Sequence, residues 1–374
     1  MSLLIGLDGS RIAKEKYTGT EHYSHIIFEH IFRVAPNHRY IIYAPKPSSK
    51  PLNTGNAQVE WKIIPFPRLW TQFRLSAEML KDKNKLDVLF IPSHTIPLAH
   101  PNNTVVTVHD LGFKYYPEYY GKLETAYQNF GLKMATKNAK RIIAISEATK
   151  KDILKFSNFD SRKIDVIHHG VDQELFRPSE ISEKPSRKIS SNIPYIYTVG
   201  RLEAKKNTPE LIKAFRILAE RYNAPHKLVL AGKPGAHGYD QVQKALDELP
   251  PPLRKRVIMP GYVSNEENAE WLRFATCFAF VSGFEGFGMP ILEAMGSGTP
   301  VVSSDKSSLP EVVGDAGLLV NHTRAEAIAD GIRKILTDKK FSATLINKGR
   351  LRAKTFTWES AARKTIATLE QAAK

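Results

Sequence analysis

Short apolar runs alternate with helix-like segments along this chain, and this alternation is the feature that most restricts its fold. Helical patterns fall between the apolar runs, for example over 20–34 and 127–138. Strand–helix alternation of this kind predicts a parallel sheet that is covered by helices on both faces. The strands predicted in the first part of the chain are Leu3–Leu7, Tyr40–Tyr43, Val59–Ile64, Val88–Ile91, Thr104–Val108, Arg141–Ile145 and Ile164–Ile167.

A second alternating series follows a polar stretch, rich in Ser and Pro, that predicts a linker. A chain of 374 residues is long for one core and comfortable for two domains. We therefore predict an α/β protein with a domain over 1–178, a linker over 179–192, a domain over 193–356 and a last helix over 357–374. The strands predicted in the second series are Tyr195–Val199, Lys227–Ala231, Val257–Met259, Cys277–Val281, Val301–Ser303 and Gly317–Val320.

The N-terminal segment and the single cysteine bear on the compartment. Cys277 lies in an apolar run and has no second cysteine to pair with, which fits a reducing compartment. The N-terminus has no basic region before its apolar stretch, and no apolar run approaches the roughly 20 residues of a membrane-spanning helix. We expect a cytoplasmic protein that does not span a bilayer.

The net charge of +16 calls for a partner of opposite charge. The excess is partly local, with ten Lys or Arg against four Asp or Glu over 122–163, and eleven against three over 333–374. No zinc-finger spacing, aromatic RNA-binding signature or basic zipper accompanies these charges, so we expect no nucleic-acid partner. Two interpretations remain, a solvated basic face and a surface for anionic phospholipid.

One basic stretch, from 68 to 85, also carries apolar side chains that include Trp70, Phe73 and Met79. An ordinary amphipathic helix packed on the sheet is one interpretation. The other is a helix that lies on an anionic membrane, which would put the protein peripherally on the inner face of the plasma membrane.

The run from Ser282 to Val302 holds the most informative chemistry. Glu285 and Glu293 stand eight residues apart, with a Gly-rich turn over 286–290 between them. Pro290 suits the first turn of a helix, so Glu285 should lie on a loop and Glu293 one turn into that helix. A helix N-terminus beside glycine backbone suits a diphosphate, and two flanking carboxylates suit the hydroxyls of a sugar and a ribose. The run predicts a nucleotide-sugar site.

Cations follow the first strand of the second series, in the segment Y-T-V-G-R-L-E-A-K-K-N. Gly200 predicts a turn there, and Arg201 and Lys206 come directly after it. Two cations just past a strand end can clamp a diphosphate. No D-x-D motif, G-x-x-x-x-G-K-[ST] loop or G-x-G-x-x-G fingerprint is present, so we expect no metal and no cofactor.

Together these runs resemble the family four retaining glycosyltransferases. The resemblance implies the GT-B fold, in which two Rossmann-like doubly wound domains face each other across a cleft and the C-terminal helix crosses back to the N-terminal domain. The N-terminal domain would then take the acceptor, and the C-terminal domain the nucleotide-sugar. The run V-H-D-L-G-F-K-Y-Y-P-E-Y-Y adds a similarity to bacterial mannosyltransferases of surface polysaccharide assembly.

The resemblance also implies roles for single residues. His109 would lie beside the donor sugar, Glu285 would hold sugar hydroxyls, and Glu293 would accept from the ribose. Ser146 would cap a helix. The residues implied in catalysis are His109, Glu285, Arg201 and Lys206, and those implied in substrate binding are Gly19, Asp110, Gly200, Arg201, Lys206, Phe287, Gly288, Met289, Pro290 and Glu293.

One segment departs from the family pattern. The family often carries Pro-Asn in the stretch before the linker, where this chain has His168 and His169, and this puts a direct role of that position in doubt.

The function that we expect is metal-independent transfer of a hexose, mannose from GDP-mannose, to a lipid-linked or oligosaccharide acceptor. UDP-glucose, UDP-GlcNAc or dTDP-rhamnose as donor remains open. So do two other classes, a nucleotide-sugar epimerase and a non-catalytic polyanion-binding protein.

Overall fold

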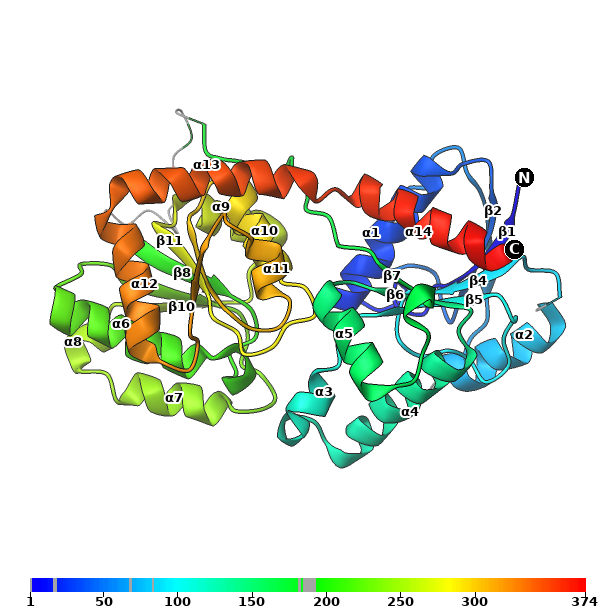
Figure 1. The fold of residues 1–374 in the computed structure, drawn as a ribbon, viewed down its shortest axis with the longest axis horizontal. Helices are drawn as coiled ribbons and strands as arrows, with labels where there is room; N and C mark the ends of the chain where they lie inside the picture. Colours follow the sequence, from blue (N-terminus) through cyan, green and yellow to red (C-terminus); the bar gives the residue numbers. More distant parts are fainter. Residues whose placement is uncertain (1, 16–18, 67–68, 83, 181–182, 184–192) are drawn as a thin grey trace. The chain divides into compact units, whose positions relative to one another are not determined.

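The computed structural model describes residues 2–15, 19–66, 69–82, 84–180, 183 and 193–374, and it divides into two compact units (Figure 1). Unit 1 comprises Met1–Tyr115, Gly121–Gly170 and Thr357–Lys374, and unit 2 comprises Tyr116–Tyr120 and Val171–Phe356. The chain thus changes unit between Gly170 and Val171, whereas the sequence boundary was set at 178. Most of the predicted linker, 179–192, lies outside the described residues.

Unit 1 is built on a parallel sheet of seven strands in the order β3-β2-β1-β4-β5-β6-β7. The chain reverses its direction of winding between β1 and β4, and ligands of such sheets bind at this switch point, beyond the carboxyl ends of the strands. The strands are β1 (Leu4–Asp8), β2 (Arg39–Ala44), β3 (Gln58–Ile63), β4 (Val88–Ile91), β5 (Thr104–Val108), β6 (Arg141–Ala144) and β7 (Ile164–Val166).

Helices cover both faces of this sheet, and one of them comes from the far end of the chain. Helix α14 (Trp358–Ala373) packs beside α1 (Gly19–Val34) and against β4, β5 and β6 (Figure 1). The predicted last helix is confirmed, and Thr357 caps it by accepting from the backbone N–H of Ser360. The other helices of the unit are η1 (Thr71–Leu75, a π-helical turn), α2 (Ser76–Asp82), α3 (Gly112–Tyr115), α4 (Lys122–Asn138) and α5 (Glu147–Phe156).

Unit 2 repeats the arrangement with a parallel sheet of six strands in the order β10-β9-β8-β11-β12-β13. Its switch point lies between β8 and β11. The strands are β8 (Tyr195–Val199), β9 (Lys227–Ala231), β10 (Val257–Gly261), β11 (Cys277–Phe280), β12 (Val301–Ser304) and β13 (Leu318–Val320). The helices are α6 (Thr208–Tyr222), α7 (Tyr239–Asp247), α8 (Pro251–Arg254), α9 (Asn265–Phe274), α10 (Met289–Gly296), α11 (Leu309–Val313), α12 (Ala325–Thr337) and α13 (Lys339–Thr355).

The core of unit 2 lies under α6 and α12, which pack against each other. Their inward residues, among them Leu211, Phe215 and Ile328, are fully buried with the apolar side chains of β8 and β9. Cys277, from the apolar run that forms β11, is buried in this cluster.

In the stretch from 68 to 85, some apolar side chains are buried and others are exposed. Trp70 and Met79 are buried, as in a helix packed on a sheet, but Phe73 is 55% exposed and Leu80 is 64% exposed. Residues 68 and 83 lie outside the described part. No helix among the described residues is both long enough and apolar enough to cross a bilayer.

Candidate functional site

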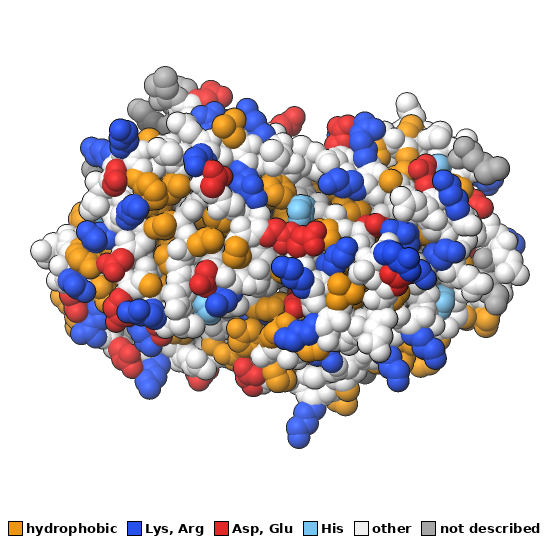
Figure 2. Space-filling view, viewed as in Figure 1, with side chains coloured by type: hydrophobic (Ala, Val, Ile, Leu, Met, Phe, Trp, Pro, Cys, Tyr) orange, Lys and Arg blue, Asp and Glu red, His pale blue; other side chains and the backbone are white. Residues whose placement is uncertain are grey.

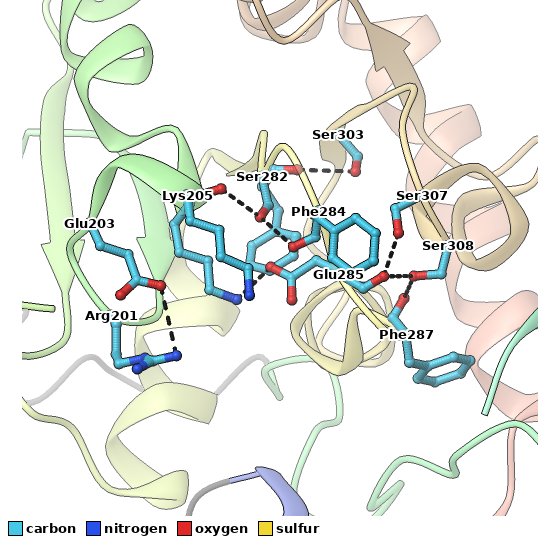
Figure 3. A network of polar contacts seen from close by, with 12 residues as sticks. Arg201, Glu203, Lys205, Ser282, Phe284, Glu285, Phe287, Ser303, Ser307 and Ser308 are labelled. Atoms are coloured by element: carbon cyan, nitrogen blue, oxygen red, sulfur yellow. Dashed lines mark hydrogen bonds and ion pairs between the residues drawn. The ribbon is translucent and has the colours of Figure 1, made fainter. Parts of the chain in front are cut away.

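The candidate site of unit 2 lies where β8 and β11 end, at the switch point of the sheet. The segment from Gly200 to Lys206 follows β8, and the segment from Ser282 to Gly288 follows β11. They are in contact, because the N–H of Gly283 and the hydroxyl of Ser282 both donate to the carbonyl of Lys205 (Figure 3). Two segments that are distant in sequence are thereby brought together at the sheet edge where a ligand is expected.

An ion pair joins the two segments. Lys206 Nζ lies 2.5 Å from Glu285 Oε1, with side chains 22% and 14% exposed. Glu285 lies on a loop, as the sequence predicted. Arg201 is directed elsewhere, since its side chain is 64% exposed and lies 3.7 Å from Glu203. The structure therefore brings Lys206 to Glu285 and leaves Arg201 at the solvent edge, rather than pairing the two cations.

Two serines that sequence reasoning missed hold the Gly-rich turn in shape. Ser307 and Ser308 donate to the carbonyl of Glu285 at 2.5 and 3.0 Å, and Ser308 also donates to the carbonyl of Phe287 at 2.9 Å (Figure 3). Ser307 has a φ of 54°, which is unusual for a residue other than Gly. A non-glycine residue held in this conformation marks a site where backbone strain is maintained by its surroundings.

Helix α10 begins at the end of this turn, with Pro290 as its second residue. Gly288 caps it with a φ of 104°, and a Cβ there would come within 2.7 Å of Leu309. The partial positive charge of the helix N-terminus favours an anion next to it. The ring of Phe287 packs against Phe356 and is 3% exposed, so this residue can reach a ligand only through its backbone.

Glu293 lies on α10, one turn inside, as predicted. Burial raises the pKa of its carboxyl to about 7, and a hydrogen bond from Asn268 opposes that rise. Asn268 Nδ2 donates to Glu293 Oε2 at 2.9 Å. A partly buried carboxylate with one oxygen already bonded is suited to accept hydrogen bonds from hydroxyl groups.

Backbone contact fixes the position of Gly200. The N–H of Gly200 donates to the carbonyl of Ala231, and a Cβ on Gly232 would come within 1.7 Å of Gly200 O. Gly232 also has a φ of 136°. A side chain at position 232 would therefore collide with the backbone of Gly200, and glycine avoids this collision.

The predicted residues His109, Asp110 and Gly19 belong to unit 1. His109 follows β5, and its Nε2 lies 2.8 Å from the carbonyl of Pro92. Because a carbonyl oxygen can only accept, Nε2 carries the proton. Burial lowers the pKa of His109, so the ring is neutral at pH 7. Asp110 Oδ1 accepts from the N–H of Gly112, and Gly19 begins α1.

The segment that departs from the family pattern is packed in the core of unit 1. His169 stacks on Trp358 and on Tyr23, with ring centroids 5.5 and 4.8 Å apart.

Ser146 caps α5 by accepting from the N–H of Thr149, which confirms its predicted role.

Unit 1 also contains a cavity of about 700 Å³ beyond the ends of β1, β2 and β4. Arg11, Lys14 and Lys46 supply positive charge to its lining, against one carboxylate, Glu15, which lies 3.3 Å from Lys46 Nζ. Trp70 and Tyr127 supply aromatic surface. Gln72 lines it too, is 6% exposed, and its Nε2 has no hydrogen-bond partner among the described residues. Cationic, aromatic and amide groups at a switch point suit a polar ligand.

Comparison with known proteins agrees with both units. Residues 179–352 match the family described as Glycosyl transferases group 1, and residues 33–175 match Glycosyltransferase Family 4. The chain is 31% identical to O-antigen chain mannosyltransferase B of Escherichia coli over 265 residues, which is 70% of this chain and 68% of that protein. It is also 31% identical to the O-antigen chain mannosyltransferase RfbU of Salmonella typhimurium, over 65% and 63% of the two chains.

Solved structures agree with this fold. HepE of Anabaena, solved with UDP and glucose, superposes with a TM-score of 0.71 at 18% identity, over 99% of this chain and 100% of its own. WaaG, a glycosyltransferase involved in lipopolysaccharide biosynthesis, superposes with a TM-score of 0.67 at 16% identity, over 97% and 98%. With two Rossmann-like units, and with Glu285 on the loop after β11 and Glu293 on the helix that follows it, the chain belongs to the family 4 glycosyltransferases of the GT-B fold.

Proposed function

We propose that this glycosyltransferase takes mannose from GDP-mannose and transfers it, with retention, to a lipid-linked or oligosaccharide acceptor in surface glycan synthesis. The observation that carries the proposal is the meeting of Lys206, Glu285 and the N-terminus of α10 at the switch point of unit 2. Several similar proteins named mannosyltransferases support the choice of sugar.

The proposed chemistry follows from charge. The bond between C1 of the sugar and the β-phosphate oxygen breaks, C1 bonds to the acceptor oxygen, and the acceptor proton passes to the departing phosphate. Negative charge grows on that phosphate, where Arg201, Lys206 and the first amides of α10 stabilise it. Glu285 holds sugar hydroxyls, and Glu293 accepts from the ribose.

In the same proposal, the backbone of Gly200 and of residues 287–290 lines the donor site of unit 2.

A nucleotide panel tests the donor. Thermal shift with GDP-, UDP-, dTDP- and ADP-sugars should give the largest stabilisation with GDP-mannose, because at equal concentration a ligand that binds the folded state more tightly raises its apparent stability more. A larger shift with UDP-glucose, UDP-GlcNAc or dTDP-rhamnose would transfer the proposal to that donor. HepE, solved with UDP-glucose, makes the uridine donor the main alternative.

Incubation of the donor without acceptor tests two other classes. Rapid conversion of the donor to an epimer would indicate an epimerase. Absence of binding to every nucleotide would favour a non-catalytic protein that binds polyanions.

Activity is expected to persist without divalent metal, because two cations flank the proposed diphosphate site. Turnover in excess chelator should match turnover with added magnesium. Loss of turnover in chelator, restored by magnesium or manganese, would contradict the proposal that these side chains stabilise the leaving group.

The product of an α-linked donor is expected to be α-linked. An inverting enzyme needs a base in line with the acceptor hydroxyl. The two candidates for that base are His109, whose Nε2 donates to a carbonyl, and Asp110, whose Oδ1 accepts from a backbone N–H, and in the proposed mechanism neither takes the acceptor proton. NMR of the anomeric proton in the product is the measurement, and a β-linkage would make one of these two residues the base.

The cavity of unit 1 is the proposed acceptor site. Its cationic lining suits phosphate on a lipid-linked acceptor, and its aromatic lining suits a sugar ring. Apolar side chains lie exposed around it, with Phe66 at 41%, Leu69 at 53% and Tyr127 at 37%. A lipid chain that leaves the cavity would contact them.

Helix α4 extends this apolar surface. Leu123, Tyr127 and Phe130 fall at i, i+4 and i+7, which is one face of the helix, and they are 89%, 37% and 41% exposed. Lys122, Lys133 and Lys137 lie on the same helix. Figure 2 shows Lys and Arg interspersed with apolar side chains on the face in view. An exposed apolar face with lysines suits an anionic bilayer surface, so we place the protein peripherally on the inner face of the plasma membrane.

Vesicle flotation checks this surface. The double variant Leu123→Ser/Phe130→Ser should bind phosphatidylglycerol vesicles at least about tenfold more weakly, since burial of each side chain contributes about 1.5–3 kcal/mol. Leu351→Ser is the matched control, because Leu351 is 68% exposed on α13 of unit 2. Binding that is equal for phosphatidylcholine and phosphatidylglycerol vesicles would contradict an electrostatic contribution.

A further inference from the structure

A chain of hydrogen bonds runs from the sheet of unit 2 to Glu293. Tyr197 Oη on β8 donates to Asn268 Oδ1 at 2.8 Å, and Asn268 Nδ2 donates to Glu293 Oε2 at 2.9 Å. These two hydrogen bonds therefore link β8, α9 and α10, each through one side chain.

When Glu293 is ionised, the hydrogen bonds of the three groups can run in one direction only. Tyr197 is fully buried and its ring stacks on Trp271 at 6.0 Å between centroids, so its hydroxyl has a fixed position. Asn268 is 6% exposed, and a buried amide needs partners for both of its ends. The phenol donates to the amide oxygen, which turns the amide nitrogen toward the carboxylate, because a carboxylate can only accept.

This arrangement divides the two oxygens of Glu293. Oε2 is held by Asn268, whereas no hydrogen bond reaches Oε1 from the residues that the structure describes. A carboxylate fixed at one oxygen loses little freedom when the other oxygen binds a ligand.

We propose that Asn268, oriented by Tyr197, is a positioning residue that holds the Glu293 carboxylate so that Oε1 accepts from a ribose hydroxyl of the donor nucleotide. The inference rests on the proposed function, in which Glu293 faces the ribose. It also gives a reason why the protein would bind ribonucleotides in preference to deoxyribonucleotides. A deoxyribose lacks a hydroxyl, so the fixed Oε1 of Glu293 would have no hydrogen-bond donor.

Protonation of Glu293 gives the inference a second readout. Because burial raises its pKa to about 7 and Asn268 lowers it, loss of the amide should raise the pKa further. Nucleotide binding that needs the carboxylate should then weaken at pH 7.5 and recover at higher pH. Several elements around Glu293 carry ionisable groups. On the strands and on α11 these are Tyr195 and Tyr197 of β8, Cys277 of β11 and Glu311 of α11. Helix α9 carries Glu266, Glu267, Glu270 and Arg273, and α13 carries Lys339, Lys340, Lys348, Arg350, Lys354 and Arg352, the last of which donates to two carbonyls of α11.

Titration calorimetry with GDP and 2′-deoxy-GDP, between about pH 6.5 and 9, tests the inference. The unmodified protein should bind GDP at least about tenfold more tightly than 2′-deoxy-GDP at pH 7.5, since a hydrogen bond to a charged group contributes that much. In Asn268→Leu the two affinities should come within about twofold at pH 7.5, and the preference for GDP should return toward pH 9. Tyr197→Phe, which keeps the amide, should reduce the preference less.

Asn265→Leu is the matched control, because it makes the same replacement at an exposed position of α9 and should leave the preference unchanged. If Asn268→Leu does not fold, the affinities for GDP and 2′-deoxy-GDP are compared in Asn268→Asp and Tyr197→Phe instead. An unchanged preference and pH profile in the Asn268 variant would overturn the inference. Equal binding of the two nucleotides by the unmodified protein would also overturn it, while the proposed function stands. Absence of binding to GDP and UDP would overturn the proposed function itself.

Discussion

Replacement of Lys206 by alanine should lower kcat/KM by about 100-fold or more. The expectation follows from the effect of removing one preorganised group that stabilises charge in a transition state. Lys206 also holds Glu285 at 2.5 Å, so its loss would leave a carboxylate that is 14% exposed without that partner and, under the proposed function, would displace it from the sugar hydroxyls. Steady-state kinetics with saturating and limiting donor would separate an effect on turnover from one on binding.

Lys213→Ala is the control for a general loss of positive charge. Lys213 lies on α6, 52% exposed, and pairs with Glu210 at 2.6 Å, so its removal should change kcat/KM by less than about twofold. Arg201→Ala should lower kcat/KM by at least about tenfold. Arg201 would contact the phosphate, but its side chain is less enclosed than that of Lys206. Near-normal kinetics in both Lys206→Ala and Arg201→Ala would contradict the assignment of the diphosphate to this site.

Replacement of Gly232 by alanine should destabilise unit 2 by about 3 kcal/mol or more and abolish nucleotide binding. The new Cβ would lie 1.7 Å from Gly200 O, which is backbone, so the two strand ends would have to separate. The φ of 136° adds strain of about 1–3 kcal/mol. Thermal unfolding and nucleotide titration of the same sample are the measurements.

Variants of two other glycines separate the two causes of destabilisation, the close contact of the new Cβ and the strain of a positive φ. Gly261→Ala places a Cβ at a φ of 79° with nothing within 4 Å, and should cost about 1–2 kcal/mol. Gly170→Ala has an ordinary φ, but its Cβ would lie 2.1 Å from the N of Trp358, so it should destabilise unit 1 strongly. Equal stability of Gly232→Ala and Gly261→Ala would show that the contact with Gly200 is relieved at little cost.

Periodicity placed the strands well because buried parallel strands are continuous apolar runs. Val88–Ile91, Thr104–Val108, Tyr195–Val199 and Lys227–Ala231 were predicted to the residue, and the other strands differ at their ends by one or two residues. The stretch 68–85 was harder, because its apolar side chains divide between core and solvent over a π-helical turn. Hydrophobicity alone does not tell a buried Met79 from an exposed Leu80.

The sequence also predicted the local geometry of the donor loop, since Glu285, Gly288 and Pro290 have positional preferences that can be read without a structure. It could not supply contacts between distant segments. Ser307 and Asn268 act through hydrogen bonds to residues 22 and 25 positions away, and neither belongs to a recognisable motif. The orientation of Arg201 toward Glu203 is likewise a result of tertiary packing.

Helix α14 has a consequence for synthesis on the ribosome. It covers α1 and three strands of unit 1, yet all of Val171–Phe356 precedes it in the chain. The apolar groove for Ile366 and Leu369 therefore stays uncovered while unit 2 is being made, and a nascent unit 1 exposes it to water and to chaperones. Unit 2, which is nearly continuous in sequence, can complete its own core first. Unit 1 begins first along the chain, yet it can be completed only after the last residue of unit 2 has been made.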